Sequence, residues 1–376
     1  MKIPSFIKKL HISNERVVCN IPLLLLELVL LVITMYGADF ILNMTSIQKV
    51  TINEADIVVN KMASVSEPLS GKKTVHEEEP EKEGFRNIAL FGVDSRSGSL
   101  DRGRSDTIMV ASINVKTHEV SLVSIYRDTY LNVGDDTFNK CNVAYAKGGA
   151  KQAINMLNMN LDLDITDYVT VGFEGLIKAI DSLGGVEIDV QENEIVHLNS
   201  YQKSMFMEDE NDTRHLNEDI VAVTHSGPQT LSGLQATAYC RIRYVGDDYA
   251  RTERQRKVIQ AMMLKASGVS VPKLTSTAYS MTPYMSTSLS VGEVVSVLGD
   301  IGGYRLVESE GLPFDEYRDA ANLGKLGACI VPVTLEDNVK KLHELLFDEA
   351  DYRVSPTVEK ISAQIKENTS VYLDSN

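Results

Sequence analysis

The sequence has 376 residues, of which 43% are hydrophobic and 24% are charged, enough for one large folded domain with additional segments. Its 52 acidic residues outnumber its 37 lysines and arginines, so the net charge is -15. Nucleic-acid binding needs a broad basic surface that displaces counterions, and this balance therefore argues against a nucleic-acid partner. The four cysteines include no CxxC pair, which argues against a zinc knuckle and a disulfide framework.

The first long apolar stretch predicts a membrane anchor. Residues 17–42 read "VVCNIPLLLLELVLLVITMYGADFIL", and about 20 mostly apolar residues suffice to cross a bilayer as a helix. Four basic residues precede it: Lys2, Lys8, Lys9 and Arg16. By the positive-inside rule, residues 1–16 form a cytoplasmic tail and the chain after Leu42 lies outside the cell membrane. A cleaved signal peptide is the alternative, but its apolar core would span only about 7–15 residues.

Composition divides the rest of the chain into three parts. Residues 43–84 end in "GKKTVHEEEPEKEG", which is too charged to pack, and predict an extracellular stalk. Residues 85–350 contain the strand and helix patterns of a folded domain, and residues 351–376 are interpreted as a C-terminal tail. We therefore expect a single-pass protein with one extracellular domain.

Three strand-like segments open the folded domain, and charged residues stand at their ends. The segments are "NIALFGV" at 87–93, "TIMVASI" at 107–113 and "VSLVSIY" at 120–126. Asp94 follows the first, Asp106 precedes the second and Arg127 follows the third. If the strands form an antiparallel meander, all three residues lie at one edge of the sheet.

Two interpretations of this edge remain open on the residues alone. Neighbouring carboxylates repel, and a divalent metal or a cationic side chain relieves that repulsion. Carboxylate oxygens without cysteine or histidine favour a hard cation such as Mg²⁺, completed by phosphate oxygens. The alternative is an ion-pair cluster of the two aspartates with nearby arginines: Arg96, Arg102, Arg104 and Arg127.

The middle of the chain alternates helix and strand patterns. Helical spacing marks residues 145–161, and "DYVTVGFEGLIKAIDSLGGVEIDV" predicts strand, helix, turn and strand over residues 167–190. This pattern indicates an α/β fold with helices packed on a sheet. Lys140 precedes the first helix and is either solvated surface or a ligand. The polar, aperiodic stretch from Gln191 to Ala222 predicts a mobile loop.

A second basic cluster follows in "YCRIRYVGDDYARTERQRKVI", residues 239–259, whose local net charge is +3. Arg251, Arg254 and Gln255 stand at i, i+3 and i+4 on one helix face, and Asp247 or Asp248 is a plausible N-cap. Cations near a helix N-terminus oppose the helix dipole, whereas an anion bound among guanidiniums and amides is stabilised by both. This placement indicates an anion site; the alternative is arginines that pair with the acidic loop.

Taken together, these segments resemble the LytR-CpsA-Psr family of cell-wall glycopolymer ligases over about Phe85 to Met263. The matching elements, in order, are "GVDSR", "RSDTIM", "SIYRDT", "NKCNVAYA", "VGFEGLIKAIDSLGGVEIDV", "LSGLQATAYCRIRY" and "DDYARTERQR". The resemblance implies a three-layer α/β/α domain with a central mixed sheet and a deep apolar groove. It also implies transfer of a phosphoglycan from a polyprenyl-pyrophosphate carrier to peptidoglycan, with Mg²⁺ (or Mn²⁺) assisting and a lipid phosphate leaving.

The same resemblance implies the site residues. Asp94 and Asp106 match the metal carboxylates, and with Arg127 they form the catalytic set; either aspartate could instead accept the proton of the attacking hydroxyl. The pyrophosphate-binding positions are Arg127, Arg241, Arg243, Arg251 and Gln255, together with Arg104 and Lys140. Where the family usually has proline before the arginine of the third-strand motif, this chain has Tyr126.

Two rival functions use the same features. A phosphatase or pyrophosphatase of prenyl pyrophosphates would bind the same anion with water as acceptor, and its product would be free glycan phosphate. A non-catalytic lipid-binding regulator of envelope assembly would bind prenyl lipid yet tolerate loss of the aspartates. The glycopolymer, whether teichoic acid or capsule, is not determined by these motifs.

Overall fold

The three predicted strands form the middle of a six-stranded mixed sheet. They are β1, Phe85–Val93, β2, Ser105–Asn114, and β3, Glu119–Ile125. Both β1–β2 and β2–β3 pair antiparallel, with Met109 of β2 opposite Leu90 on one side and Ser124 on the other. The predicted meander is therefore confirmed.

The computed structural model describes residues 56–60, 84–93, 100–101, 103–207 and 220–373. The expected membrane segment at 17–42, most of the stalk, and Asp94 lie outside these ranges. Among the helices that are described, none is both long enough and apolar enough to cross a bilayer.

Three further strands complete the large sheet: β6, Asp167–Gly172; β9, Met285–Thr287; and β10, Arg305–Leu312. The strand order is β10-β3-β2-β1-β6-β9, with β10 parallel to β3 and β6 parallel to β1. The parallel pairs need long crossover connections, and these contain the helices that lie between residues 143 and 299.

Three two-stranded sheets accompany the large sheet: β4, Tyr130–Asn132, with β5, Phe138–Lys140; β7, Val186–Val190, with β8, Gly227–Leu231; and β11, Arg318–Asn322, with β12, Ala328–Pro332.

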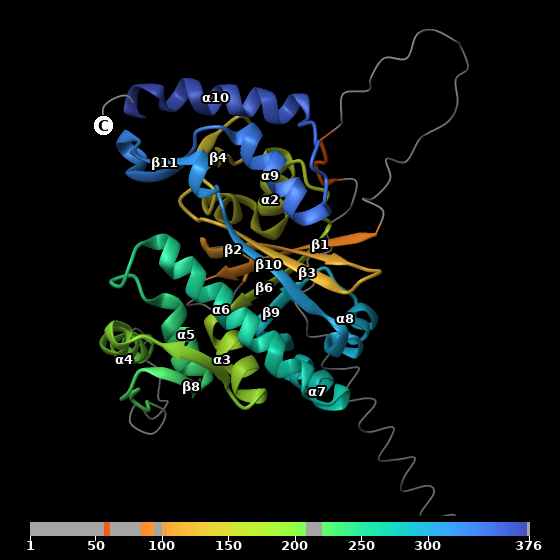
Figure 1. Ribbon diagram of the computed structural model, residues 1–376, viewed down its shortest axis with the longest axis vertical. Helices are drawn as coiled ribbons and strands as arrows, with labels where there is room; N and C mark the ends of the chain where they lie inside the picture. Colours follow the sequence, from red (N-terminus) through yellow and green to blue (C-terminus); the bar gives the residue numbers. More distant parts are fainter. Residues whose placement is uncertain (1–55, 61–83, 94–99, 102, 208–219, 374–376) are drawn as a thin grey trace, which may run out of the picture. The chain divides into compact units, whose positions relative to one another are not determined.

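One face of the sheet is covered by α2, Val143–Leu161, α9, Leu335–Phe347, and α10, Pro356–Leu373 (Figure 1). Apolar residues of α2 recur at helical spacing and pack against inward-facing strand residues in the main core. The stretch 351–376 does not behave as the tail expected from sequence, because α10 buries Val358, Ile361 and Ile365 in this core. The folded domain therefore extends well past residue 350.

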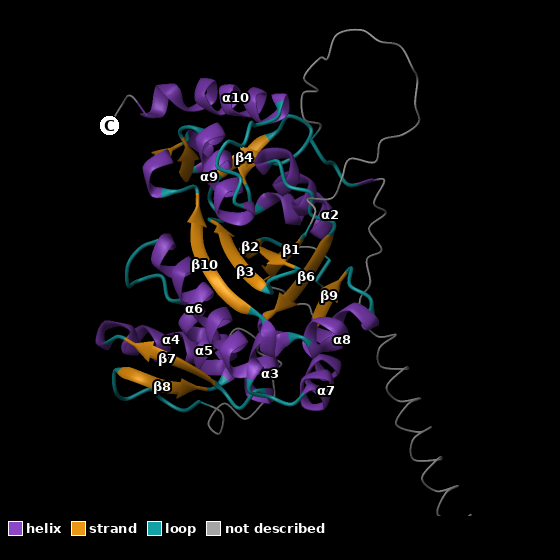
Figure 2. Cartoon of the chain, turned by 45° about the vertical axis from the view of Figure 1, so that its right-hand side comes forward, coloured by secondary structure: helices purple, strands orange, loops and turns teal. Residues whose placement is uncertain are grey.

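The other face carries a larger group of helices, which Figures 1 and 2 show on the side of the sheet away from α2 and α10. They are α3, Phe173–Ser182; α4, Glu192–Met207; α5, Gly233–Arg241; α6, Asp248–Ser267; α7, Val271–Met281; and α8, Val291–Gly299. Short 3-10 turns connect later elements: η3, Thr282–Tyr284; η4, Ile301–Gly303; η5, Asp315–Tyr317; and η6, Gly324–Leu326. The three-layer α/β/α arrangement confirms the fold class expected from sequence.

The mobile loop predicted from Gln191 to Ala222 is wrong for its first half, which is helix α4. The sequence of α4 is polar because it lies at the margin of the domain and buries only a narrow stripe. Leu198 is fully buried in a satellite core, with Ile195 packed against that core. Glu194, in the first turn of α4, is also buried, and its partner comes from α6, as described below.

Candidate functional site

Asp106 and Arg127 meet where β2 begins and β3 ends, as the meander predicted. Asp106 is the second residue of β2, and Arg127 follows β3 by two positions. The Arg127 Nη1 group donates a hydrogen bond to Asp106 Oδ1 at 2.8 Å. Asp94, expected at the same edge, lies outside the described residues.

Two arginines from the second basic cluster converge on the same carboxylate. Arg251 Nη2 lies 3.3 Å from Asp106 Oδ2 and also donates to the Asp106 backbone carbonyl at 3.1 Å. Arg243 Nη2 lies 3.5 Å from Asp106 Oδ2. Arg251 is 4% exposed, so its charge is almost wholly removed from water and depends on these partners. The fold thus joins the two basic clusters around one aspartate.

The charges of this cluster shift one another's pKa values. Burial alone would raise the pKa of Asp106, but the nearby guanidiniums of Arg251 and Arg127 outweigh it and hold the pKa below the usual range. Burial and the positive charge of Arg127 lower the pKa of Arg251, although Asp106 opposes both. Asp106 is therefore ionised at neutral pH, while Arg251 is a cation under electrostatic strain that an added anion would relieve.

We expect the stabilising effect of Asp106 to disappear in acid. A carboxylate with a depressed folded pKa stabilises the fold above its unfolded pKa of about 3.9 and loses that effect as the pH falls through the folded pKa. The difference in unfolding free energy between the wild type and Asp106→Asn should be constant from neutral pH to about pH 5, and shrink below it. Urea titrations at each pH measure this difference; one that stays constant to the acid limit contradicts the assignment.

The N-terminus of α6 supplies a second carboxylate, which the sequence indicated only as a possible helix cap. Asp247 is the N-cap and accepts from the backbone N–H of Ala250 at 3.1 Å. Asp248 instead points at the cluster, with Oδ1 3.2 Å from Arg251 Nη1 and 3.5 Å from Arg127 Nε. Asp248 therefore connects the two guanidiniums, and the signal available in sequence was its i, i+3 spacing from Arg251.

Three buried polar atoms of this cluster have no hydrogen-bond partner among the described residues: Arg127 Nε, Arg251 Nε and Asp248 Oδ2. Buried polar atoms are normally paired by hydrogen bonds. Arg127 Nε has only long ion-pair contacts, at 3.5 Å to Asp248 and 3.6 Å to Asp128, so the cluster keeps hydrogen-bonding capacity for a polar ligand. The planar forks of arginine suit phosphate oxygens in particular.

The arginine cluster lies at one end of a cavity of about 650 Å³ between the sheet and the helices α3, α5, α6 and α7. Polar residues gather at this end: Asp106, Thr107, Arg241, Arg243, Arg251 and Gln255. The remaining lining is mostly apolar and includes Leu90, Val171, Phe173, Leu176, Val258, Ile259, Met262, Met263, Leu274, Met281 and Leu298. A ligand matched to this cavity has an anionic head and a long apolar body.

Of the other predicted site residues, two line this cavity and two do not. Gln255 lines it and is 7% exposed, and Arg241 lines it with its guanidinium over the Phe173 ring at 4.7 Å. Lys140 lies behind the cluster, where its Nζ is 3.1 Å from Asp128 Oδ1. Arg104 is exposed just before β2 and does not line the cavity.

Arg254 has a structural role instead of the anion contact that helical spacing suggested. Its Nε donates to Glu194 Oε1 of α4 at 2.7 Å, and both side chains are 6% exposed. Its Nη1 and Nη2 groups donate to the carbonyls of Ile242 and Val245 at 3.2 and 2.6 Å. Arg254 therefore fixes the loop that carries Arg243.

Of the two predicted metal carboxylates, the structure describes Asp106, whose oxygens lie 2.8–3.5 Å from the guanidiniums of Arg127, Arg243 and Arg251. Asp106 is ionised, lines the cavity and keeps 21% of its side chain exposed. No group of three or more histidine, cysteine, aspartate or glutamate side chains that could hold an ion occurs in the described ranges. Mg²⁺ does not need such a cage, because it is commonly held by one or two carboxylates and the phosphates of a substrate.

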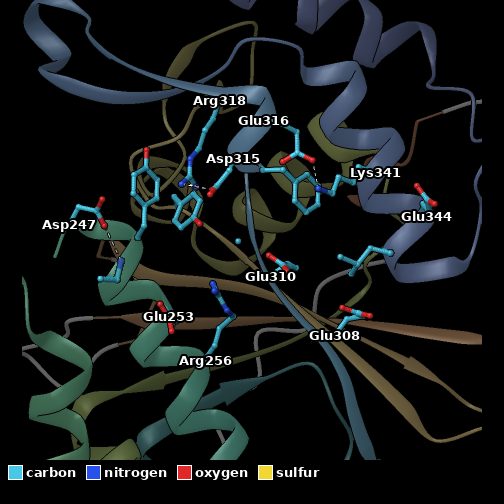
Figure 3. Close-up of a pocket in the computed structure, with 16 residues that line it drawn as sticks. Asp247, Glu253, Arg256, Glu308, Glu310, Asp315, Glu316, Arg318, Lys341 and Glu344 are labelled. Atoms are coloured by element: carbon cyan, nitrogen blue, oxygen red, sulfur yellow. Dashed lines mark hydrogen bonds and ion pairs between the residues drawn. The ribbon is translucent and has the colours of Figure 1, made fainter. Parts of the chain in front are cut away.

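A second cleft, of about 820 Å³, lies between α6 and α9 (Figure 3). Several of its charged groups pair with one another: Arg318 with Asp315 at 2.5 Å, and Lys341 with Glu316. The Arg318 guanidinium lies over the Tyr249 ring at 3.6 Å. Helix α6 thus separates two cavities. The first, which has arginines at one end and an apolar lining elsewhere, is the better candidate for function.

Tyr126 belongs to the wall of this second cleft, not to the anion site. Its ring meets Tyr249 edge-on at 4.7 Å, and its hydroxyl fills the space beside Gly311, where an added Cβ would lie 2.1 Å from that oxygen. The tyrosine is therefore accommodated by a glycine on β10, and Arg127 still reaches Asp106.

Comparison of the whole sequence with known proteins identifies a family with which the chain shares most of its length. The model of the LytR_cpsA_psr family matches residues 45–321. The polyisoprenyl-teichoic acid–peptidoglycan teichoic acid transferase TagU of Enterococcus faecalis is 32% identical over 224 residues, covering 58% of this chain and 66% of that protein. TagU of Bacillus subtilis is 31% identical over 213 residues, covering 56% and 61%. The chain thus spans somewhat less than two thirds of the length of these relatives.

The fold has a solved counterpart. The structure of the LytR-CPS2A-psr family protein YwtF (TagT) with bound octaprenyl pyrophosphate lipid superposes with a TM-score of 0.52 at 20% identity, covering 72% of this chain and 94% of that one. At this level of identity the likeness shows the fold.

Proposed function

The chain belongs to the LytR_cpsA_psr family, and from that premise we propose that it transfers a phosphoglycan from a polyprenyl-pyrophosphate carrier to peptidoglycan. We place this reaction at the outer face of the cell membrane, with residues 17–42 as a single-pass anchor and the N-terminus in the cytoplasm. The relatives named as teichoic acid transferases support the reaction class and the peptidoglycan acceptor.

The observation that carries the proposal is the cavity with two contrasting ends. Asp106 and Arg251 line one end of this cavity of about 650 Å³, and the rest of its lining is mostly apolar. Arg127 pairs with Asp106 but does not itself line the cavity. A polyprenyl pyrophosphate has this same division between a doubly charged head and a hydrocarbon tail. Burying the tail fixes the position of the head, so the binding energy of the lipid orients the reacting phosphorus.

Each side chain at the polar end has a role in this chemistry. Phosphoryl transfer builds charge on the equatorial and leaving oxygens, and preorganised guanidiniums stabilise that charge where water is excluded. Arg127 and Arg251 contact the pyrophosphate, while Asp248 holds both guanidiniums in place. Arg241, Arg243 and Gln255 complete the binding of the head, and Lys140 supports the cluster through Asp128.

We assign Mg²⁺ (or Mn²⁺) to Asp106 and Asp94, where the ion would neutralise phosphate charge when bound. The depressed pKa of Asp106 favours this role over that of general base, because an efficient base has a pKa near the working pH. The proton of the attacking hydroxyl then needs another acceptor.

A transfer assay tests the proposed function. The full chain in detergent micelles is mixed with a synthetic prenyl-pyrophosphate saccharide and peptidoglycan oligomers, with and without Mg²⁺, and all products are analysed by mass spectrometry. We expect a phosphodiester-linked adduct together with free prenyl phosphate. Free glycan phosphate without adduct would instead identify a pyrophosphatase, and bound lipid without any product would identify a non-catalytic lipid-binding protein.

A further inference from the structure

The turn that joins α6 to α7 separates the apolar end of the cavity from solvent. On its inner side, Met263, Ala266 and Leu274 line the cavity. On its outer side, Leu264 is 70% exposed and Val271 is 39% exposed. The outer side of this part of the cavity wall therefore presents two large aliphatic side chains to solvent.

The charge around this turn differs from that of the whole chain. Residues 254–292 contain no aspartate or glutamate, although the chain holds 52 of them. Lys265 follows Leu264 directly, Lys273 stands two positions after Val271, and both lysines are exposed. The acids on the neighbouring helices are Glu293 of α8, Asp300 at the end of α8, and Glu174 and Asp181 of α3. Asp181 accepts a hydrogen bond from the Gly233 N–H at 2.6 Å. The turn itself is apolar and cationic.

We propose that the turn from Leu264 to Lys273 is a bilayer-contacting surface. Leu264 and Val271 enter the boundary between headgroups and acyl chains, while Lys265 and Lys273 bind the phosphates of anionic lipids. This inference rests on the proposed function, because a prenyl chain leaving a bilayer takes the shortest apolar path to the cavity. Two aliphatic side chains are too few for the interface of about 1,000 Å² or more that a specific protein complex needs.

Fluorescence quenching tests the surface independently of catalysis. Three of the four cysteines are buried, and the fourth, Cys19, is replaced with serine. An environment-sensitive probe is attached from outside to Leu264→Cys or Val271→Cys in the full chain, reconstituted in phosphatidylcholine–phosphatidylglycerol vesicles. The matched control is Val333→Cys, which is also 39% exposed but lies between β12 and α9 in the other helical layer.

We expect quenching by aqueous iodide to be about threefold or more weaker at positions 264 and 271 than at 333, because a group buried about 5–10 Å into the interface is shielded. The shielding should weaken when phosphatidylglycerol is omitted. Equal quenching at 271 and 333 in anionic vesicles would overturn the inference.

A second experiment separates this surface from the proposed function. The variant Leu264→Ser/Lys265→Gln/Val271→Ser/Lys273→Gln is expected to transfer about threefold or more slowly from a long-chain donor embedded in vesicles, yet at the wild-type rate from a short-chain soluble donor. Val333→Ser should leave both rates unchanged. Equal losses with both donors would contradict the inference, whereas absence of product from the wild type would count against the proposed function and leave the quenching result decisive for the surface.

Discussion

Replacing Arg127 with alanine is expected to reduce transfer by at least about a hundredfold, because removing one preorganised donor from a charge-stabilising site commonly costs 10²–10³ in rate. The Arg127 side chain joins the carboxylates of Asp106 and Asp248 and keeps a buried Nε without a hydrogen-bond partner among the described residues. That nitrogen faces the carboxylates of Asp248 and Asp128 at 3.5 and 3.6 Å, so the side chain also holds the charged cluster together. Initial rates of adduct formation at saturating donor measure the loss.

Two controls make the result specific. Arg305→Ala removes an arginine that is 72% exposed and paired with Glu119 on the surface, and should leave the rate unchanged. Arg127→Lys keeps the charge without the planar fork, so we expect a rate between those of the wild type and alanine variants. Thermal unfolding of each variant checks that the domain is intact. A folded Arg127→Ala protein with full activity would remove this residue from the mechanism.

Replacing Arg254 with methionine is expected to destabilise the domain by about 3–5 kcal/mol, because it leaves a buried carboxylate without its partner. Arg254 and Glu194 are each 6% exposed and 2.7 Å apart, and the same guanidinium holds the backbone at Ile242 and Val245. The double variant Glu194→Gln/Arg254→Met should recover much of the loss, since no charge then remains buried. Denaturant unfolding curves of the three proteins provide the comparison.

Another pair on the same helix is the matched control. Glu253 and Lys257 of α6 are also 2.7 Å apart, but each is about half exposed, at 53% and 52%. Exposed pairs contribute at most about 1 kcal/mol, so Lys257→Met should change stability little. Similar losses for Arg254→Met and Lys257→Met would show that burial does not determine the effect.

The parts of the site that could be predicted from residues depend on local geometry. The short connection from β2 to β3 makes these strands an antiparallel pair, so the contact between Asp106 and Arg127 follows from strand ends. The N-cap at Asp247 is equally local. The meeting of Asp106 with Arg251 joins residues 145 positions apart, and only the family resemblance indicated it.

Three sequence predictions were wrong, those for Arg254, for helix α4 and for helix α10, and the first two required knowing which side chains are buried. Each residue turns a helix by about 100°, so positions 251, 254 and 255 span about 100° of the circumference of α6. The residues on this arc have different neighbours: Arg251 and Gln255 line the cavity, whereas Arg254 pairs with Glu194. Because α4 is polar overall, its few buried residues gave no apolar periodicity. Helix α10 does carry apolar residues at helical spacing, Val358, Ile361 and Ile365, so here the interpretation as a tail missed a signal that was present.

The length of helix α6 sets the distance between the arginine cluster and the turn that follows the helix. Arg251 and Ala266 are 15 positions apart on it, which at 1.5 Å per residue is about 22 Å along the axis. The proposed bilayer contact would then place the reacting phosphorus no more than about that height above the lipid headgroups. The helix length then sets how much of the donor must be drawn out of the membrane, and shortening α6 by one turn would lower the working height by about 5.4 Å.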